Sequence, residues 1–280
     1  MDNYQLTQDQ ITAYGVCLRT EEHTPSTIEK YLRDTRAFAV WLEGRPVTRE
    51  LAAEWRDRLL SSGHKPSTVN SMLAAVNGLF RFLGWGIRVK FLKVQRRLFR
   101  DQSRELTRGE YDLLVNTARA AGKERLAPLM EAVCATGVRV SEVKYLTVEA
   151  AQCGRAEIAL KGKIRMILLP NKLCRKLLKY ARKQKIASGE IFLTRSGRSL
   201  SRRQIWAEMK QLCKATGVAS EKVYPHNLRH LFARTFYQAC KDIARLADVL
   251  GHSSIETTRI YLVTTGAEQV RQLDRLGLVS

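Results

Sequence analysis

The sequence predicts a mainly α-helical protein with one small β-sheet. Apolar residues recur every three or four positions along most of the 280-residue chain, which is the pattern of helices that bury one face. One short stretch has instead the pattern of a β-hairpin. Positive charge is concentrated in a segment between two helical regions, so we expect two domains joined by a basic linker. The hydrophobic fraction of 45% is that of a globular protein.

The first region, residues 1–87, is expected to fold as about four helices. Two helix starts share a Pro-Ser-Thr signature, at 25–27 and 66–68, and Thr48 opens a third helix between them. A serine or threonine oxygen at such a start accepts a hydrogen bond from an unpaired backbone N–H group, which is the simplest explanation of the signature. The same N–H groups also bind phosphate, and Lys65 beside the second start is a candidate for that contact.

Charge is the most informative bulk property of the chain. Lys and Arg total 48 and Asp and Glu total 27, which gives a net charge of +21. Residues 88–100 and 161–185 contain six and ten basic residues, respectively, and no acidic residue. Such runs predict a polyanionic partner, because each phosphate that a cation neutralises releases counterions. We therefore interpret residues 88–104 as a basic linker whose candidate DNA contacts are Arg88, Lys90, Lys93, Arg96 and Arg97.

The second region begins near Thr107, which forms a capping-box pattern with Glu110 before a helix. Another helix follows through residues 126–133. The β-hairpin is predicted at residues 157–169, with its turn at Lys161-Gly162-Lys163. Further helices are expected at about 171–184, 201–215, 226–239, 242–250, 255–262 and 267–275.

Several classes of protein do not fit the sequence. It has no apolar run long enough to span a membrane and no apolar signal-peptide core at the N-terminus, so we expect a cytoplasmic protein. The six cysteines are scattered and lack the spacing of zinc ligands. We expect neither a bound metal nor a cofactor.

The C-terminal half contains residues suited to phosphodiester cleavage. This reaction needs cations on the non-bridging oxygens and an acid for the leaving oxygen. Arg139 and Arg229 are candidates for the cations, since a planar guanidinium binds two phosphate oxygens and keeps its charge. His226 lies one helical turn before Arg229, on the same face. Lys161 at the hairpin tip is a candidate proton donor.

Tyr261 is the candidate nucleophile, because surrounding cations favour its phenolate form. A tyrosyl ester conserves the energy of the broken bond, so strand exchange would need no ATP. A nuclease that activates water would instead use carboxylates around a metal ion, and the sequence has no such acidic cluster. Taken singly, Tyr261 is explained as a packed aromatic residue and His252 as a helix-end residue. Their joint order on a basic background favours a site.

Four stretches resemble the tyrosine recombinase, or phage-integrase, family. Ala135–Glu142 is similar to its first arginine box, and Pro225–Ala233 to its His-x-x-Arg box. Leu250–Tyr261 is similar to its final box, and Lys161-Gly162-Lys163 to its lysine hairpin. The two Pro-Ser-Thr helices resemble the family's core-binding domain, so the resemblance extends over nearly the whole chain.

The resemblance implies a role for each candidate residue. Tyr261 would form a 3′-phosphotyrosyl link, and Lys161, or Lys163 two residues on, would protonate the leaving 5′ oxygen. Glu142 would support the scaffold of the site. A 5′ hydroxyl from the partner strand would then attack, and exchange would pass through a Holliday junction. The scissile phosphate would be held by Arg139, His226, Arg229 and His252.

The resemblance also implies domains and partners. The expected parts are a core-binding domain (1–87), a linker (88–104), a catalytic domain (105–262) and a tail (263–280), which packs on a neighbouring subunit or folds back. A homotetramer would act on two specific sites in double-stranded DNA, with a possible accessory directionality factor and no membrane. No arm-site-binding domain is expected.

The leading functional prediction is integration and excision of a mobile element. Within the same chemistry, a Xer-like chromosome-dimer resolvase and a DNA invertase stay open. A type IB topoisomerase uses similar groups but would relax supercoils without pairing two sites. The alternative of another class is a non-catalytic DNA-binding protein on the same fold.

Overall fold

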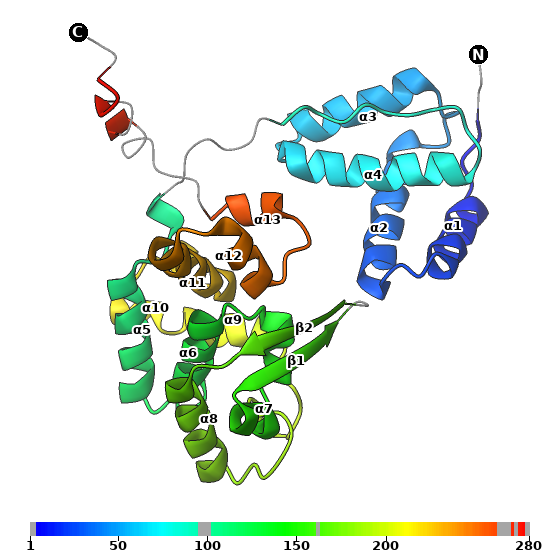
Figure 1. Ribbon diagram of the computed structural model, residues 1–280. Coiled ribbons are helices and arrows are strands. Elements are labelled where there is room, and N and C mark those ends of the chain that lie inside the picture. Colours follow the sequence, from blue (N-terminus) through cyan, green and yellow to red (C-terminus); the bar gives the residue numbers. More distant parts are fainter. Residues whose placement is uncertain (1–3, 95–101, 161–162, 262–269, 272–273, 278–280) are drawn as a thin grey trace. The chain divides into compact units, whose positions relative to one another are not determined.

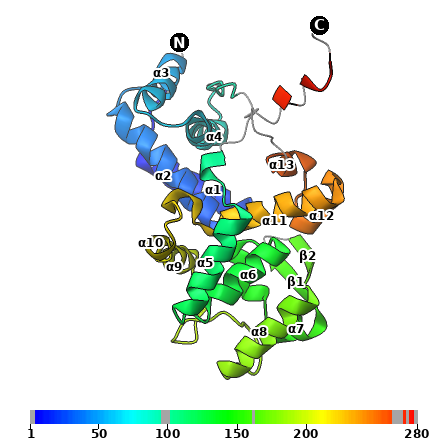
Figure 2. The same cartoon turned by 90° about the vertical axis from the view of Figure 1, so that its left-hand side faces the viewer.

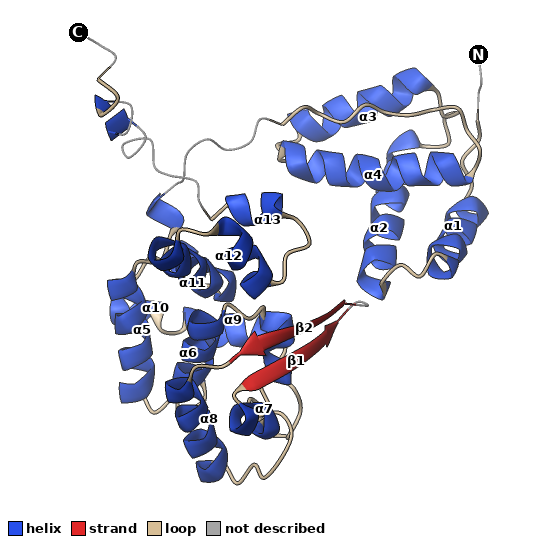
Figure 3. Ribbon diagram, in the orientation of Figure 1, coloured by secondary structure: helices blue, strands red, loops and turns tan. Residues whose placement is uncertain are grey.

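In a computed structural model of the chain, the structure describes residues 4–94, 102–160, 163–261, 270–271 and 274–277 (Figure 1). The chain divides into two compact units, Met1–Arg96 and Arg97–Ser280. Regular structure in the described residues is almost all helical, with one two-stranded sheet, so the predicted class is confirmed (Figure 3). Among these residues no helix is both long and apolar enough to cross a membrane.

The first unit is built from four helices around an aromatic core. Phe38 lies fully buried and meets the rings of Trp55 and Phe80 edge-on, at centroid distances of 5.0 and 5.7 Å. Such edge-to-face pairs add to the free energy gained by burying the rings. The four helices are α1 (Gln8–Thr20), α2 (Pro25–Leu42), α3 (Arg49–Ser61) and α4 (Pro66–Phe82).

The Pro-Ser-Thr starts are not capped as predicted. Thr24 and Lys65 are the N-caps of α2 and α4, and neither side chain makes a capping hydrogen bond. The Thr24 hydroxyl is instead within 2.9 Å of the Thr27 hydroxyl. Proline at the first helical position explains both starts, because its fixed φ suits a helix and it has no N–H group to satisfy. Thr48 does cap α3, accepting a hydrogen bond from the backbone N–H of Leu51 at 3.2 Å.

The basic segment after α4 is attached to that helix. The Asn77 side chain donates to the Val89 carbonyl and accepts from the Val89 N–H, both at 2.9 Å. Asn70 pairs in the same way with Leu92, at 2.9 and 2.8 Å. Val89 is thereby buried, and the basic side chains on either side of it are exposed. Of the candidate DNA contacts, Arg88, Lys90 and Lys93 lie on this stretch; Arg96 and Arg97 lie outside the described residues, and the linker boundaries stay a prediction.

The second unit follows the predicted order of elements. The capping box at its start is confirmed: the Glu110 N–H donates to the Thr107 hydroxyl, and the Thr107 N–H donates to the Glu110 carboxylate. The predicted helix 201–215 is broken into two, and that at 255–262 ends as a helix at Arg259. The predicted helix 267–275 falls mostly outside the described residues. The helices are α5 (Arg108–Ala120), α6 (Leu126–Thr136), α7 (Val148–Cys153), α8 (Asn171–Lys183), α9 (Arg202–Lys210), α10 (Cys213–Thr216), α11 (Pro225–Cys240), α12 (Ile243–Leu250) and α13 (Ile255–Arg259), with short 3₁₀ turns η1 (Gln102–Arg104), η2 (Val140–Tyr145) and η3 (Ser220–Lys222).

The predicted hairpin is present. Strand β1 (Arg155–Leu160) pairs antiparallel with β2 (Lys163–Leu168), and Leu160 lies opposite Lys163. Residues 161 and 162 lie outside the described residues, and they include the predicted proton donor Lys161. Alternation along β2 turns Ile164 and Met166 outward, whereas Arg165 lies on the inner face with Ile167.

Helix α6 ends where the candidate site begins. Gly137 closes the helix with φ +65°, a left-handed conformation that favours glycine. A Cβ atom built there would lie 2.4 Å from the Phe232 side chain, so glycine is also required by close packing. The chain then turns into η2 and brings Arg139 next to the C-terminal end of α12. Figures 1 and 2 show α11 and α12 together at one end of this unit, with α8 at the other.

The pairing of Asn77 with Val89 yields a test of the first unit. Asn77→Ala should lower the free energy of unfolding by about 2–3 kcal/mol, because it leaves a buried N–H and a buried carbonyl without partners. Urea unfolding followed by tryptophan fluorescence measures this, since Trp41, Trp55 and Trp85 all belong to the unit. Glu54→Ala on the exposed face of α3 is the control and should change stability by less than about 0.5 kcal/mol. Equal losses of stability for the two substitutions would show that the hydrogen bonds between Asn77 and Val89 do not stabilise the unit.

Candidate active site

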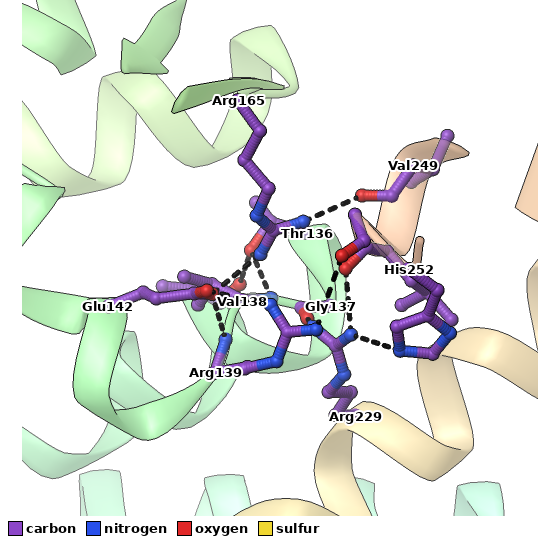
Figure 4. A network of polar contacts seen from close by, with 12 residues as sticks. Thr136, Gly137, Val138, Arg139, Glu142, Arg165, Arg229, Val249 and His252 are labelled. Atoms are coloured by element: carbon purple, nitrogen blue, oxygen red, sulfur yellow. Dashed lines mark hydrogen bonds and ion pairs between the residues drawn. The ribbon is translucent and has the colours of Figure 1, made fainter. Parts of the chain in front are cut away.

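The carboxylate of Glu142 is the buried centre of a polar network in the second unit (Figure 4). It accepts hydrogen bonds from the Arg139 backbone N–H and guanidinium, both at 2.8 Å. It also accepts one from the Arg165 guanidinium at 2.5 Å. Burial alone would raise the pKa of Glu142, but the hydrogen bonds and charge of the two arginines lower it below its usual value. Glu142 is therefore an anion that offsets two buried or half-buried cations.

The C-terminal end of α12 supplies a second set of acceptors for arginine. The carbonyl of Val249 accepts from Arg165 at 3.1 Å, and that of Leu250 from Arg229 at 2.9 Å. The carbonyl of Gly251 accepts from Arg139 at 3.4 Å. Three successive carbonyls thus contact three guanidinium groups. The last carbonyls of a helix have no partner within it and carry the negative end of the helix dipole, so they suit cations.

Gly251 makes this arrangement possible. It ends α12 with φ +63°, in the left-handed region. A Cβ atom at this position would lie 2.3 Å from the Arg165 side chain. Any other residue would therefore displace Arg165 and turn the last carbonyls of the helix.

Arg229 is the most deeply buried cation of the site, with 1% of its surface exposed. It comes from α11 and donates to the carbonyl of Gly137 at the end of α6, as well as to Leu250. Burial and the neighbouring cations lower the pKa of Arg229, whereas the nearby Tyr261 acts in the opposite direction. A guanidinium stays protonated through such a shift. Arg139, by contrast, keeps 38% of its side chain exposed.

His252 is held as a neutral ring. Its Nε2 lies 2.9 Å from the Arg229 guanidinium, and its Nδ1 lies 2.8 Å from the hydroxyl of buried Thr258. A guanidinium can only donate, so Nε2 accepts and the proton sits on Nδ1, which donates to Thr258. Burial and the positive charges of Arg229 and the other arginines lower the pKa of His252 to about 4. The ring is therefore uncharged near neutral pH in the absence of DNA.

His226 and Tyr261 complete the site. His226 lies in the first turn of α11, and part of its side chain is exposed. Desolvation of its ring, together with the charges of Arg229 and Arg139, lowers its pKa. Tyr261 follows α13 and is buried, with 4% exposed. Its ring stacks on His252 at 6.0 Å and meets His230 edge-on at 4.6 Å. The Tyr261 ring thus lies against the histidine that contacts the Arg229 guanidinium.

The described structure gathers six of the predicted site residues in this one place: Arg139, Glu142, His226, Arg229, His252 and Tyr261. Three neighbours were not predicted: Arg165, Thr258 and His230. The only sequence signal of Arg165 is its place among apolar residues of the predicted hairpin, and the register of the hairpin decides that it lies on the inner face. Thr258 and His230 lie inside two of the stretches that resemble the family, but no role was predicted for either.

The first unit has a separate feature near the predicted contact Lys65. A cleft of about 540 Å³ is bordered by Lys30, Arg33, His64 and the first turn of α4. Buried Asp34 holds the two cations, Lys30 at 2.6 Å and Arg33 at 3.0 Å. The helix start that borders the cleft has no side-chain cap; Pro66 has no N–H group, and the Thr68 N–H donates to the Lys65 carbonyl at 2.8 Å.

Comparison with family models gives two matches. The model described as "Phage integrase family" matches residues 104–267. The model described as "Phage integrase, N-terminal SAM-like domain" matches residues 11–86.

Among curated proteins, the tyrosine recombinase XerC of Roseiflexus castenholzii is 31% identical, over 90% of this chain and 88% of its own. The tyrosine recombinase XerA of Thermococcus kodakarensis is 28% identical, over 91% of this chain and 90% of its own.

Solved structures share the fold at lower identity. The lambda integrase tetramer bound to a Holliday junction has a TM-score of 0.73 at 19% identity, over 93% of this chain and 78% of its own. The Tn1549 transposon integrase with transposon right end DNA has a TM-score of 0.71 at 16% identity, over 96% of this chain and 99% of its own. XerH bound to palindromic difH substrate has a TM-score of 0.71 at 18% identity, over all of this chain and 91% of its own.

Arg165 provides a first test of the site. Arg165→Ala should destabilise the second unit by about 2–3 kcal/mol, because charged hydrogen bonds to Glu142 and to the end of α12 are lost in a buried setting. Urea unfolding followed by circular dichroism measures the loss. Arg108→Ala removes an exposed ion pair with Asp112 and should cost less than about 1 kcal/mol. A loss for Arg165→Ala no larger than this control would show that the network does not depend on Arg165.

The lowered pKa of His252 predicts a pH dependence of stability. Between pH 6.5 and about 4 the unfolded chain binds a proton at this ring that the folded chain does not, so folding stability falls as the pH falls through that window. His226 contributes in the same direction. His252→Gln should make the stability of the second unit change less steeply between pH 7 and 5. Thermal melts across this range test it, and a slope equal to that of the parent protein would be the contrary result.

Proposed function

This chain belongs to the phage integrase family of tyrosine-type site-specific recombinases, enzymes that break and rejoin DNA, and we propose how its residues share that reaction. The single observation that carries the proposal is the position of Tyr261, which is buried with its ring stacked on His252, the residue whose Nε2 lies 2.9 Å from the Arg229 guanidinium. In this position its ring lies next to the side chains that we expect to contact a phosphodiester. We assign Tyr261 as the nucleophile, which forms a 3′-phosphotyrosyl bond while the 5′ oxygen leaves.

Arg139 and Arg229 hold the scissile phosphate in this proposal. Attack on the phosphorus adds negative charge to the non-bridging oxygens, and guanidinium groups already fixed in place stabilise that charge with little reorganisation. The carbonyls of Gly137 and Leu250 fix Arg229, and Glu142 fixes Arg139. In this proposal Glu142 orients Arg139 and does not itself contact the phosphate.

The two histidines are proposed to donate hydrogen bonds to the phosphate, and a lysine is proposed to donate a proton to the leaving oxygen. A bound phosphate brings negative charge beside His226 and His252, which favours their protonated forms and allows them to donate to its oxygens. Thr258 keeps the ring of His252 oriented through Nδ1. Lys161, or Lys163 across the turn, is proposed to protonate the leaving 5′ oxygen. Their ammonium groups lie outside the described structure, so this role is carried over from the family.

The DNA backbone is proposed to be held by exposed cations of the first unit. Lys65 lies at the uncapped start of α4, next to the cleft lined by Lys30 and Arg33. Arg88, Lys90 and Lys93 project from the segment that Asn70 and Asn77 hold against α4. Arg96 and Arg97 continue the same basic run in the sequence.

We propose that four copies act together on two duplexes. Exchange between two duplexes requires four strand cuts, and each copy supplies one Tyr261. Lambda integrase, whose fold is similar, has been solved as a dimer on a core site and as a tetramer on a Holliday junction. An accessory directionality factor is proposed for the excision reaction, since cleavage and rejoining are chemically symmetric.

Two biological roles fit this chemistry. Our leading proposal is integration and excision of a mobile element, and the similar fold of the Tn1549 transposon integrase supports it. The second is chromosome-dimer resolution of the Xer type, which the names of the curated relatives favour. Both roles are tested by deleting the gene. The Xer role predicts dimeric chromosomes and filamentous cells. The mobile-element role predicts that the junction of the excised circular element, detected by amplification, disappears. Normal chromosomes together with an unchanged junction would contradict both roles.

The nucleophile is tested by trapping the covalent intermediate. A duplex that spans the junctions flanking the gene, nicked near the cleavage point, should yield a protein–DNA adduct that survives denaturing electrophoresis. Tyr261→Phe should abolish the adduct, and Arg229→Ala should reduce it by at least about 100-fold, since one lost oxyanion contact costs about 3 kcal/mol or more. Tyr237→Phe, on the last part of α11, is the control and should retain it. An adduct that persists in Tyr261→Phe would mean that another residue attacks the phosphate.

A further inference from the structure

Helix α8 carries a stripe of cations that the proposed site does not use. Its apolar face, which includes Leu173 and Leu177, is buried against the rest of the unit. The exposed basic residues recur at intervals of three, four and three, which places them along one side of the helix over about 15 Å. We call these four residues the α8 stripe: Lys172, Arg175, Lys179 and Arg182.

The α8 stripe differs from the other cations of the same helix in its partners. Lys176 pairs with Glu131 at 2.5 Å, and Lys183 pairs with Glu124. In contrast, the four members of the stripe make no ion pair with any carboxylate in the described part of the chain. The two lysines that border the stripe are neutralised, and the stripe itself keeps its full charge.

The charge pattern of the stripe works against the helix itself. Like charges three or four residues apart destabilise a helix by about 0.2–0.5 kcal/mol per pair. Lys172 lies in the first turn, where the helix dipole favours an acid, and this turn contains none. The stripe therefore does not stabilise the fold of the unit. A polyanion bound along it would attract all four cations and offset their mutual repulsion.

The stripe lies apart from the proposed cleavage site. Figures 1 and 2 show α8 at one end of the second unit, and α12 and α13 at the other. A short DNA segment at Tyr261 would therefore leave α8 uncovered. Duplex DNA has one phosphate per about 3.4 Å of axis on each strand, so a 15 Å stripe faces about four phosphates of one strand. Four cations match that number.

We propose that the α8 stripe binds the sugar–phosphate backbone of DNA that flanks the cleaved segment, without reading its base sequence. DNA that continues from the bound core is present at high effective concentration, because it is tethered to the same protein. The inference rests on the DNA substrate of the family and on the charges of α8; it does not depend on the roles assigned to Tyr261 or the arginines.

The test compares two double variants that remove the same charge from the same helix. Lys172→Gln/Lys179→Gln removes two members of the stripe, and Lys176→Gln/Lys183→Gln removes the two neutralised lysines. Binding of the full-length protein to two duplexes that both carry the recombination junction is measured across salt concentrations. One duplex of about 300 bp is twice the persistence length and can bend back to α8. The other, of about 16 bp, spans only about 54 Å, so it is too short and stiff to bend back to α8 from the junction.

On the long duplex, the stripe variant should lower the slope of log affinity against log salt by about 1.8, or 0.9 per lost phosphate contact. The paired-lysine variant should change it by less than about 0.5, and neither should alter binding to the short duplex. Equal changes of slope in the two variants would mean that only the net charge of the helix matters. An unchanged slope in the stripe variant would mean that the stripe does not contact phosphate. Either result overturns the proposal. Adduct formation on the short nicked substrate should stay normal in the stripe variant, which separates this inference from the catalytic one.

Discussion

The end of one helix holds together three positive charges that would otherwise repel each other. The carbonyls of residues 249, 250 and 251 each accept a hydrogen bond from a different arginine. The buried carboxylate of Glu142 takes up the remaining charge of two of these arginines. Burying cations is costly unless every one is paired or hydrogen-bonded, and here a helix terminus and a single acid meet that condition. The rest of the site depends on this arrangement.

Its consequence is a site whose cations are in place before DNA arrives. Arg229 is fixed by the ends of both α6 and α12, whereas Arg139 stays partly exposed and accessible to a phosphate. Fixed charges of this kind stabilise a transition state without the cost of reorganising water or side chains. Burial and the same arginines keep His252 neutral. A bound phosphate would offset their positive charge and favour the protonated form of His252. Substrate binding and proton transfer are thereby linked through one network.

The sequence predicted the members of this site that lie next to helix ends. Arg139 follows the glycine that closes α6, and His252 follows the glycine that closes α12, so their motifs carry the local geometry with them. Arg165 was missed because its role depends on the register of the hairpin, which decides whether an arginine faces solvent or the core. The caps of α2 and α4 were predicted incorrectly, because proline at the first helical position replaced the hydroxyl cap. Pairing between distant elements, such as Asn77 with Val89, has no signal in a single sequence.

The central claim is that one chain supplies both the nucleophile and the cations that activate its target. Mixing the Tyr261→Phe and Arg229→Ala proteins on a nicked recombination substrate tests this most directly, because each lacks what the other retains. If Tyr261 attacks the phosphate held by its own chain, no copy in the mixture is complete, and the covalent adduct should stay at the background of the separate variants. Recovery of adduct to a substantial fraction of the parent level would show that the tyrosine of one subunit serves the arginines of another, and would contradict the account.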